Sequence, residues 1–224
     1  MKKPEGEPGG EPEALQRLPP GRHGLPREFV VRNQRNRLTA GMIATVAENG
    51  YHETTIAQIS AAAGVGRRTF YSYFSSKEEC FLDTLGVIGG HLEEAMREAA
   101  EGEREWPRKV RSRLGALLGS LSANPDLVRF SLIAPVAAGG ELSKRHRVFL
   151  ERLVDVVTEG RPAKCGTQPS RSIEQALTGA LAALLVGQVD AGRGERLPEL
   201  APELVELLLS PYLGRKRAIA VADG

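Results

Sequence analysis

The stretch from Thr54 to Phe74, TTIAQISAAAGVGRRTFYSYF, restricts the possible fold more than any other part of the sequence. Its start, Thr55-Ile56-Ala57-Gln58, is a capping box, in which the Thr55 hydroxyl accepts a hydrogen bond from the third amide and Gln58 reaches back. The helix that follows should stop at Gly64, because glycine can adopt the left-handed conformation of a tight turn. A second short helix comes next, so the stretch predicts a helix-turn-helix.

A longer helix precedes this motif. Leu38, Met42 and Val46 recur every four residues and define one apolar face of a helix of about 20 residues. The helix should end near Asn49-Gly50, because glycine is a common C-cap. A long helix followed by two short ones around a glycine turn is the arrangement of a small DNA-binding domain.

The second short helix separates apolar from basic and hydroxyl side chains. With Phe70 and Phe74 turned inward, a step of about 100° per residue points Arg68 outward. An arginine in the first turn of such a helix can form two hydrogen bonds with guanine, whereas tyrosine hydroxyls and a lysine at the next helix start suit phosphates. The alternative is an amphipathic helix with two solvated arginines. The candidates for DNA contact are Arg67, Arg68, Tyr71, Tyr73 and Lys77.

The charge distribution favours DNA binding. The net charge is only +2, but residues 22–77 hold eight lysines and arginines against three acids. Residues 78–105 hold nine acids against two arginines. A basic module beside an acidic one predicts that only the first contacts a polyanion. A non-specific architectural binder is disfavoured, because such proteins gain affinity from broad positive charge.

The longer stretch TTIAQISAAAGVGRRTFYSYFSSKEECFLDTL resembles the DNA-binding signature of TetR/AcrR transcriptional regulators, over Arg32 to about Leu85. The family pattern runs from Thr-Thr-hydrophobic through Ala-Gly-Val to Thr-Phe-Tyr-x-x-Phe-x-x-Lys-Glu. The resemblance implies an all-α fold, with an N-terminal three-helix helix-turn-helix DNA-binding domain and a C-terminal helical domain for ligand binding and dimerisation. The sequence departs from the pattern at Gly66, where the family usually has a capping serine or threonine. Glycine still caps tolerably, so the helix should form.

The resemblance also implies roles for individual residues of the motif. Thr55 would anchor the first motif helix to a phosphate. The residues facing bases or the nearby backbone would be Arg67, Arg68 and Thr69. The residues binding phosphates would be Tyr71, Tyr73 and Lys77.

The chain divides by composition into four segments. Residues 1–26 are rich in glycine and proline and are expected to be a disordered tail. Residues 27–76 form the expected DNA-binding domain and residues 77–213 the ligand-binding and dimerisation domain. Residues 214–224 are expected to be a frayed C-terminal tail.

The second domain reads as a series of helices, with a loop at RPAKCGTQPS. The last helix should end at Pro211. The segment SIEQALTGALAALLVGQV is apolar nearly all round, which predicts burial on more than one side. In the resembling family the last two helices pair with a second subunit as a four-helix bundle; the alternative is that they close the monomer core. The residues expected at this dimer surface are Ala176, Ala180, Ala183, Gly187, Leu204, Leu207 and Leu208. Apolar residues of the middle helices are candidates for a ligand pocket, with plain core as the alternative: Leu117, Leu121, Phe130, Ile133, Phe149 and Leu153.

These observations predict a cytoplasmic, homodimeric regulator that binds double-stranded DNA at an inverted-repeat operator. The resemblance implies a repressor that a small-molecule effector releases. The alternative is a redox-responsive DNA-binding regulator without a small-molecule ligand, acting through Cys80; Cys80 and Cys165 form no CxxC pair. No catalytic motif, phosphate-binding glycine loop or metal-ligand spacing is present, so we expect no enzyme activity, cofactor or metal. The longest uncharged apolar stretch, 14 residues, is too short for a membrane span, and no signal-peptide-like run occurs.

Overall fold

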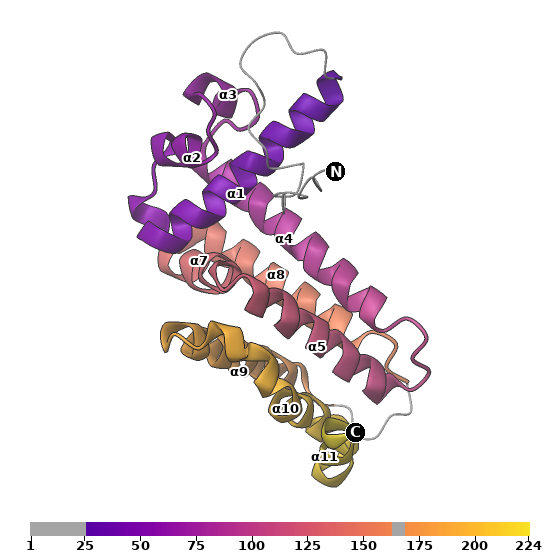
Figure 1. The fold of residues 1–224 in the computed structure, drawn as a ribbon. Coiled ribbons are helices and arrows are strands. Elements are labelled where there is room, and N and C mark those ends of the chain that lie inside the picture. The colour runs from indigo at the N-terminus through magenta and orange to yellow at the C-terminus, as the bar shows by residue number, and fades with distance from the viewer. Residues whose placement is uncertain (1–25, 163–168) are drawn as a thin grey trace, which may run out of the picture.

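The computed structural model describes residues 26–162 and 169–224, and those residues form helices and no strand. Figure 1 shows α1, α2 and α3 at one end of the molecule and the other helices stacked beyond them. The all-α fold expected from the sequence is therefore confirmed. The elements are α1 (Arg27–Glu53), α2 (Ile56–Ala62), α3 (Arg67–Tyr71), α4 (Lys77–Ala99), α5 (Trp106–Ala123), α6 (Asp126–Val128), the π-helical turn η2 (Arg129–Ile133), α7 (Ala134–Ala138), α8 (Gly140–Thr158), α9 (Arg171–Asp190), the 3₁₀ turn η3 (Gly194–Leu200), α10 (Ala201–Leu213) and α11 (Arg215–Asp223).

The helix-turn-helix forms as its local chemistry predicts. The Thr55 hydroxyl accepts from the Gln58 amide and the Gln58 side chain accepts from the Thr55 amide, which completes the capping box of α2. Gly64 has a φ of 60° in the turn that follows. The helix before the motif is broken at Gly50, where φ is 76°, close to the end expected from the sequence. Gly41 lets α1 approach α2, because a Cβ there would lie 2.9 Å from the Ile59 carbonyl oxygen.

α4 connects the helix-turn-helix to the rest of the molecule (Figure 1). It begins where the Ser76 hydroxyl accepts a hydrogen bond from the Glu79 amide. Near this end Phe81 stacks on Phe130 of η2, with ring centroids 4.3 Å apart, and meets Tyr51 of α1 edge-on at 5.2 Å. These aromatic contacts tie the DNA-binding helices to the second part of the chain.

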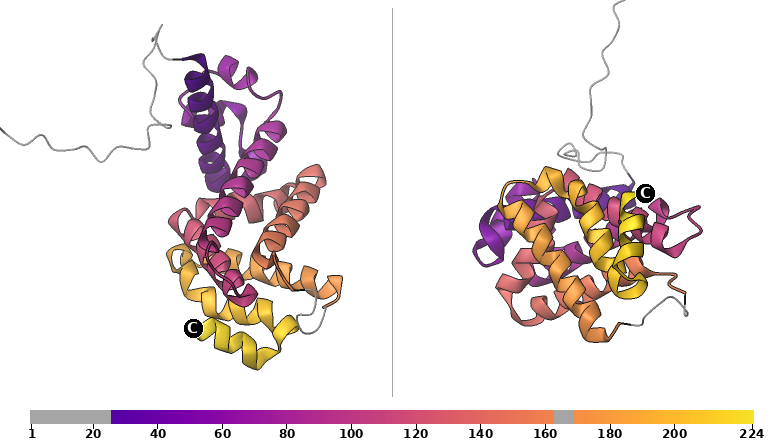
Figure 2. Two further views of the ribbon diagram at one scale, coloured as in Figure 1. Left: turned by 90° about the vertical axis from the view of Figure 1, so that its right-hand side faces the viewer. Right: turned by 90° about the horizontal axis from the view of Figure 1, so that it is seen from below.

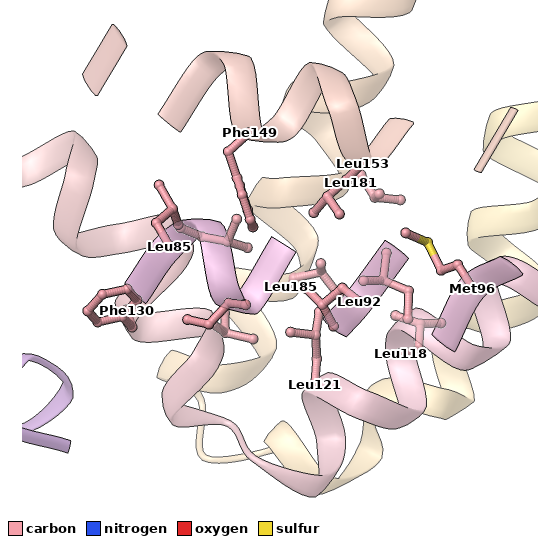
Figure 3. Packing of buried hydrophobic residues seen from close by; sticks show 14 of the residues in the cluster. Leu85, Leu92, Met96, Leu118, Leu121, Phe130, Phe149, Leu153, Leu181 and Leu185 are labelled. Carbon is pink, nitrogen blue, oxygen red and sulfur yellow. The ribbon is translucent and has the colours of Figure 1, made fainter. Parts of the chain in front are cut away.

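The second part packs around α4, α5 and α8, and α9, α10 and α11 cover the end farthest from the helix-turn-helix (Figure 2). Leucines from α4, α5, α8 and α9 meet in its core (Figure 3). A charged cluster around Glu93 interrupts this apolar packing. The buried carboxylate of Glu93 on α4 pairs with Arg152 of α8 at 2.6 Å and with Arg97 at 3.5 Å. Both arginines reach toward solvent, so the cluster clamps α4 to α8 without leaving a charge unpaired.

The C-terminal residues differ from the sequence-based prediction. Residues 215–223 form helix α11, which packs on α10 and buries Ala218 completely. The prediction of a frayed tail from residue 214 was wrong. Ala218 and Ala222, small and four positions apart, let α11 lie close against α10. α10 also continues through Pro211 and ends at Gly214, whose φ is 76°. The division of the chain into domains stays a prediction.

α9 is less buried than its composition indicated. Only Leu181, Leu185 and Val189 of this helix are buried in the protomer. α9 is also the one helix among the described residues that is long and apolar enough to cross a membrane by length and composition alone. Core helices of soluble proteins meet the same criterion, so a single such helix is weak evidence for a membrane span. Six residues of the predicted loop before α9, 163–168, lie outside the described residues.

Candidate DNA-binding surface and ligand cavity

α3 presents two arginines and a tyrosine to solvent. Phe70 is fully buried and anchors the helix, while Arg67 and Arg68 are exposed and Tyr71 is 58% exposed. Neither arginine side chain forms a hydrogen bond or ion pair with another described residue. The sequence-based orientation of α3 is thus confirmed, and both guanidinium groups are available to a partner.

The two threonines expected to contact DNA, Thr55 and Thr69, differ in their exposure to solvent. Thr55 is exposed at the start of α2, and its hydroxyl donates to Gln58 Oε1 at 2.7 Å within the capping box. Thr69 is half-buried on the flank of α3. Gly66 caps α3 without a side chain, and its carbonyl accepts from the amides of Thr69 and Phe70 at 2.9 and 3.1 Å. α3 therefore forms despite the departure from the family pattern.

Tyr73 and Lys77 are engaged inside the domain. The Tyr73 hydroxyl donates to Gln34 Oε1 of α1 at 2.9 Å, and burial raises the pKa of Tyr73. Lys77 Nζ donates to the carbonyls of Tyr51 at 2.7 Å and Thr54 at 2.8 Å, and it lies 4.3 Å from the centre of the Tyr51 ring. Burial lowers the pKa of Lys77. Lys77 thus stabilises the end of α1, and phosphate binding by both residues stays a prediction.

Sequence reasoning missed two arginines of α1 that hold this unit together. Arg37 is buried and donates from Nη2 to the Gly64 carbonyl at 2.8 Å, which fixes the turn between α2 and α3. Arg35 forms an ion pair with Asp83 of α4. The partners lie 27 and 48 residues away in the sequence, so no local pattern indicates them.

A small apolar cavity of about 30 Å³ lies between α4, η2, α5, α8 and α9. Four of the six predicted pocket residues line it: Leu117, Leu121, Phe149 and Leu153. The other two predicted residues do not line the cavity: Phe130 stacks on Phe81 instead, and Ile133 is not among the lining residues. Figure 3 shows Phe149, Leu153 and Leu181 on one side of this core and Leu121 on the other, with Leu92 and Leu185 between them. The sequence did not indicate the contribution of α4 and α9, which includes Leu92, Thr178, Leu181, Ala182 and Leu185.

Among the described residues that line the cavity, Ser131 and Thr178 are the ones with polar side chains. Both hydroxyls are already satisfied, since Ser131 donates to the Leu127 carbonyl at 2.5 Å and Thr178 to the Glu174 carbonyl at 2.9 Å. A ligand in this cavity would therefore meet an apolar wall.

Cys80 has the environment of a core thiol. It is fully buried on α4, and its burial, together with the nearby Asp83 and Glu79 carboxylates, raises its pKa to about 12. Redox sensors need an accessible thiolate, which is scarce here at neutral pH. Cys165, the second candidate for a redox role, lies outside the described residues.

Comparisons with known proteins agree with this geometry. The family model for bacterial regulatory proteins of the tetR family matches residues 41–84. The fatty acid metabolism regulator protein of Bacillus subtilis (strain 168) is 30% identical over 81 residues, which are 34% of this chain and 42% of the relative. The HTH-type transcriptional regulator TcmR of Streptomyces glaucescens is 33% identical over 87 residues, 39% of this chain and 38% of that protein. The matched region thus spans about two fifths of these curated relatives.

The likeness to solved structures extends over the second part of the chain. The crystal structure of the transcriptional regulator FadR from Bacillus subtilis in complex with stearoyl-CoA has a TM-score of 0.68 at 21% identity, and the match covers 79% of this chain and 98% of that one. At this identity the likeness establishes the fold.

An exposed, arginine-bearing second helix on a capped helix-turn-helix is the arrangement of a DNA-binding domain. The helix-turn-helix part of the chain is thus of the type found in the tetR family of bacterial regulatory proteins.

Proposed function

We propose that this protein is a homodimeric repressor that binds an inverted-repeat operator in the cytoplasm and is released by a fatty acyl-CoA thioester. The apolar cavity beside α4 is the observation that carries the proposal. Leu92 lines this cavity, and the same helix begins beside the helix-turn-helix. A ligand that displaces α4 therefore also displaces the DNA-contacting side chains.

The chemistry of the cavity favours an apolar chain, and its small size means that such a chain would have to spread the helices to enter. A volume of about 30 Å³ accommodates roughly one water molecule, whereas ligand pockets usually measure about 300–1,000 Å³. The described conformation is therefore a closed one, and the effector would stabilise an open one. An acyl chain suits a wall made of leucine, phenylalanine and valine, and the FadR of Bacillus subtilis, which has the same fold, was crystallised with stearoyl-CoA.

Dimerisation is supported by an exposed apolar stripe on α9. Ile173 is 45% exposed and Leu184 is 40% exposed, and small residues lie between them at helical spacing. Burying such a stripe against the same stripe of a second subunit removes apolar area from water and creates a two-fold axis. Two helix-turn-helix units related by that axis would read an inverted repeat. The stripe consists of Ile173, Ala176, Ala180, Ala183, Leu184 and Gly187.

The prediction that Leu204 and Leu208 of α10 belong to the dimer surface is wrong. Leu204 is fully buried and Leu208 is 3% exposed in the protomer, so both residues belong to the core of one chain. Leu207 is half-buried, so part of its side chain remains exposed.

Operator release by a defined ligand tests the proposal. The parent protein bound to a fluorescent operator should show a falling anisotropy when palmitoyl-CoA is added, and coenzyme A alone should have no such effect. A separate thermal melt should show stabilisation by palmitoyl-CoA, of about 2.7 kcal/mol at 100 times its dissociation constant. A complex that neither dissociates nor gains stability with palmitoyl-CoA would show that the effector class is wrong.

A further inference from the structure

Three surface grooves border the apolar cavity, and each shares lining residues with it. Phe149 lies between the cavity and a groove of about 720 Å³ between α4 and α8. Val154 and Thr178 lie between the cavity and a polar groove formed by α8, α9 and α10. Leu92 lies between the cavity and a groove formed by α1, α4 and α5. A ligand longer than the cavity could leave it past any of these walls.

The charges of the grooves distinguish between the three exits. The α4–α8 groove has four carboxylates and two arginines: Glu78, Glu79, Asp83, Glu93, Arg145 and Arg152. The α8–α10 groove has three carboxylates and two arginines: Glu151, Asp155, Glu174, Arg161 and Arg171. The α1–α4–α5 groove has neither an acid nor a lysine or arginine in its lining. An anionic head group is therefore repelled least at the Leu92 exit.

The groove beyond Leu92 continues into a basic one. Its lining shares Asn36, Thr39 and Val87 with a second groove, and the two measure about 490 and 470 Å³. The second groove follows α1 and carries Arg27, Arg32, Arg35 and Glu28. Val31, one of the exposed large apolar residues, also lines it and is 42% exposed.

Two of these arginines are available to a ligand. Arg35 is paired with Asp83, whereas neither Arg27 nor Arg32 forms an ion pair with another described residue. From Arg32 to Ile43 the helix rises about 16 Å, which is the length scale of an extended pantetheine arm. The surface thus offers an apolar cavity, a groove without acids, lysines or arginines, and a pair of guanidinium groups in that order.

We propose that the head of the acyl-CoA leaves the cavity past Leu92, runs between α1 and α4, and places its phosphates on Arg27 and Arg32. This inference rests on the proposed effector and adds the position of its head group. α1 belongs to the helix-turn-helix unit, so the ligand would contact the DNA-binding part directly as well as through α4. Basic residues at the start of α1 would then bind the phosphates of the effector in the released state.

Binding measured without DNA tests the assignment. Isothermal titration with palmitoyl-CoA and with palmitate should be carried out on the parent and on Arg27→Ala/Arg32→Ala. We expect the double variant to lose affinity for palmitoyl-CoA at least about tenfold, because charge-assisted hydrogen bonds are lost, and to keep its affinity for palmitate. Arg145→Ala and Arg171→Ala, at the other two exits, are the matched controls and should bind palmitoyl-CoA like the parent.

A second pair of variants tests the route without changing charge. Val87→Phe narrows the place where the two grooves join and should weaken palmitoyl-CoA binding, while Val148→Phe in the α4–α8 groove should not. Equal palmitoyl-CoA affinity in the parent and the double arginine variant, or losses confined to Arg145→Ala or Arg171→Ala, would overturn the head-group position and leave the proposed effector intact. A parent that binds neither palmitoyl-CoA nor palmitate would overturn the proposed function itself.

Discussion

Gly41→Ala should separate the two helices that form the base of the DNA-binding unit. A Cβ at this position would lie 2.9 Å from both the Ala63 amide nitrogen and the Ile59 carbonyl oxygen. Both are backbone atoms, so α2 must shift as a whole to relieve the contact. Overpacking of this kind costs about 1–3 kcal/mol, and the better helix propensity of alanine recovers at most about 1 kcal/mol. We expect the unfolding free energy to fall by about 1–2 kcal/mol.

Gly90→Ala is the matched control for this change. Gly90 lies inside α4, is exposed, and has no atom within 4 Å of a built Cβ. The same substitution there should raise the unfolding free energy by about 0.5–1 kcal/mol. Urea denaturation followed by circular dichroism measures both values, and operator anisotropy measures binding. Gly41→Ala should also bind the operator more weakly, because the turn before α3 moves with α2. A Gly41→Ala protein as stable as Gly90→Ala would refute the close packing of α1 on α2.

Four further predictions follow from the same structure. Arg68→Ala should weaken the binding free energy for the operator by about 1–3 kcal/mol and relax the preference at one base pair per half-site, whereas Tyr71→Phe should weaken binding to all sequences alike. Selection from random operators distinguishes the two variants. An unchanged base preference in Arg68→Ala would show that Arg68 does not read a base. Ala180→Glu should give a folded monomer with weak operator binding in sedimentation and anisotropy experiments, while Ala123→Glu on α5 should remain dimeric; a dimeric Ala180→Glu would show that the interface lies elsewhere. Leu121→Ala should lower the unfolding free energy by about 2–5 kcal/mol. Because it also enlarges the cavity, it should reduce the palmitoyl-CoA concentration needed to release the operator. Leu118 is buried but does not line the cavity, so Leu118→Ala should show the loss of stability without the change in release. Above about pH 9 the thiol of Cys80 ionises in the unfolded chain, whereas in the folded protein its pKa of about 12 keeps it protonated. Rising pH therefore favours the unfolded state, and the unfolding free energy should fall by up to about 1.4 kcal/mol per pH unit through this residue. Cys80→Ala should lack this component when both proteins are melted at a series of pH values.

The parts of the fold that depend on neighbouring residues could be predicted from the sequence. The Thr55–Gln58 capping box, the left-handed Gly64 and the inward side of α3 all follow from residues a few positions apart. Each is decided by backbone geometry and helical period, which act over one or two turns.

The features that depend on distant residues could not be predicted. The hydrogen bonds of the Lys77 ammonium group to the carbonyls of Tyr51 and Thr54 at the end of α1 join residues more than 20 positions apart, so no local pattern indicates them. Leu208 was expected in the dimer surface, but it is buried in the core of the protomer. Amphipathic spacing shows that a helix has an apolar face, but it does not show which partner covers that face.

The distance between the two recognition helices in the dimer tests most directly whether filling the cavity moves the DNA-binding units. Spin labels at Ser72→Cys, which is exposed just after α3, can be placed in a Cys80→Ala/Cys165→Ser background. Double electron–electron resonance should then give one distance distribution for the protein alone and a shifted distribution with saturating palmitoyl-CoA. Release of the operator by palmitoyl-CoA with an unchanged distance distribution would contradict the coupling of the cavity to α3 through α4.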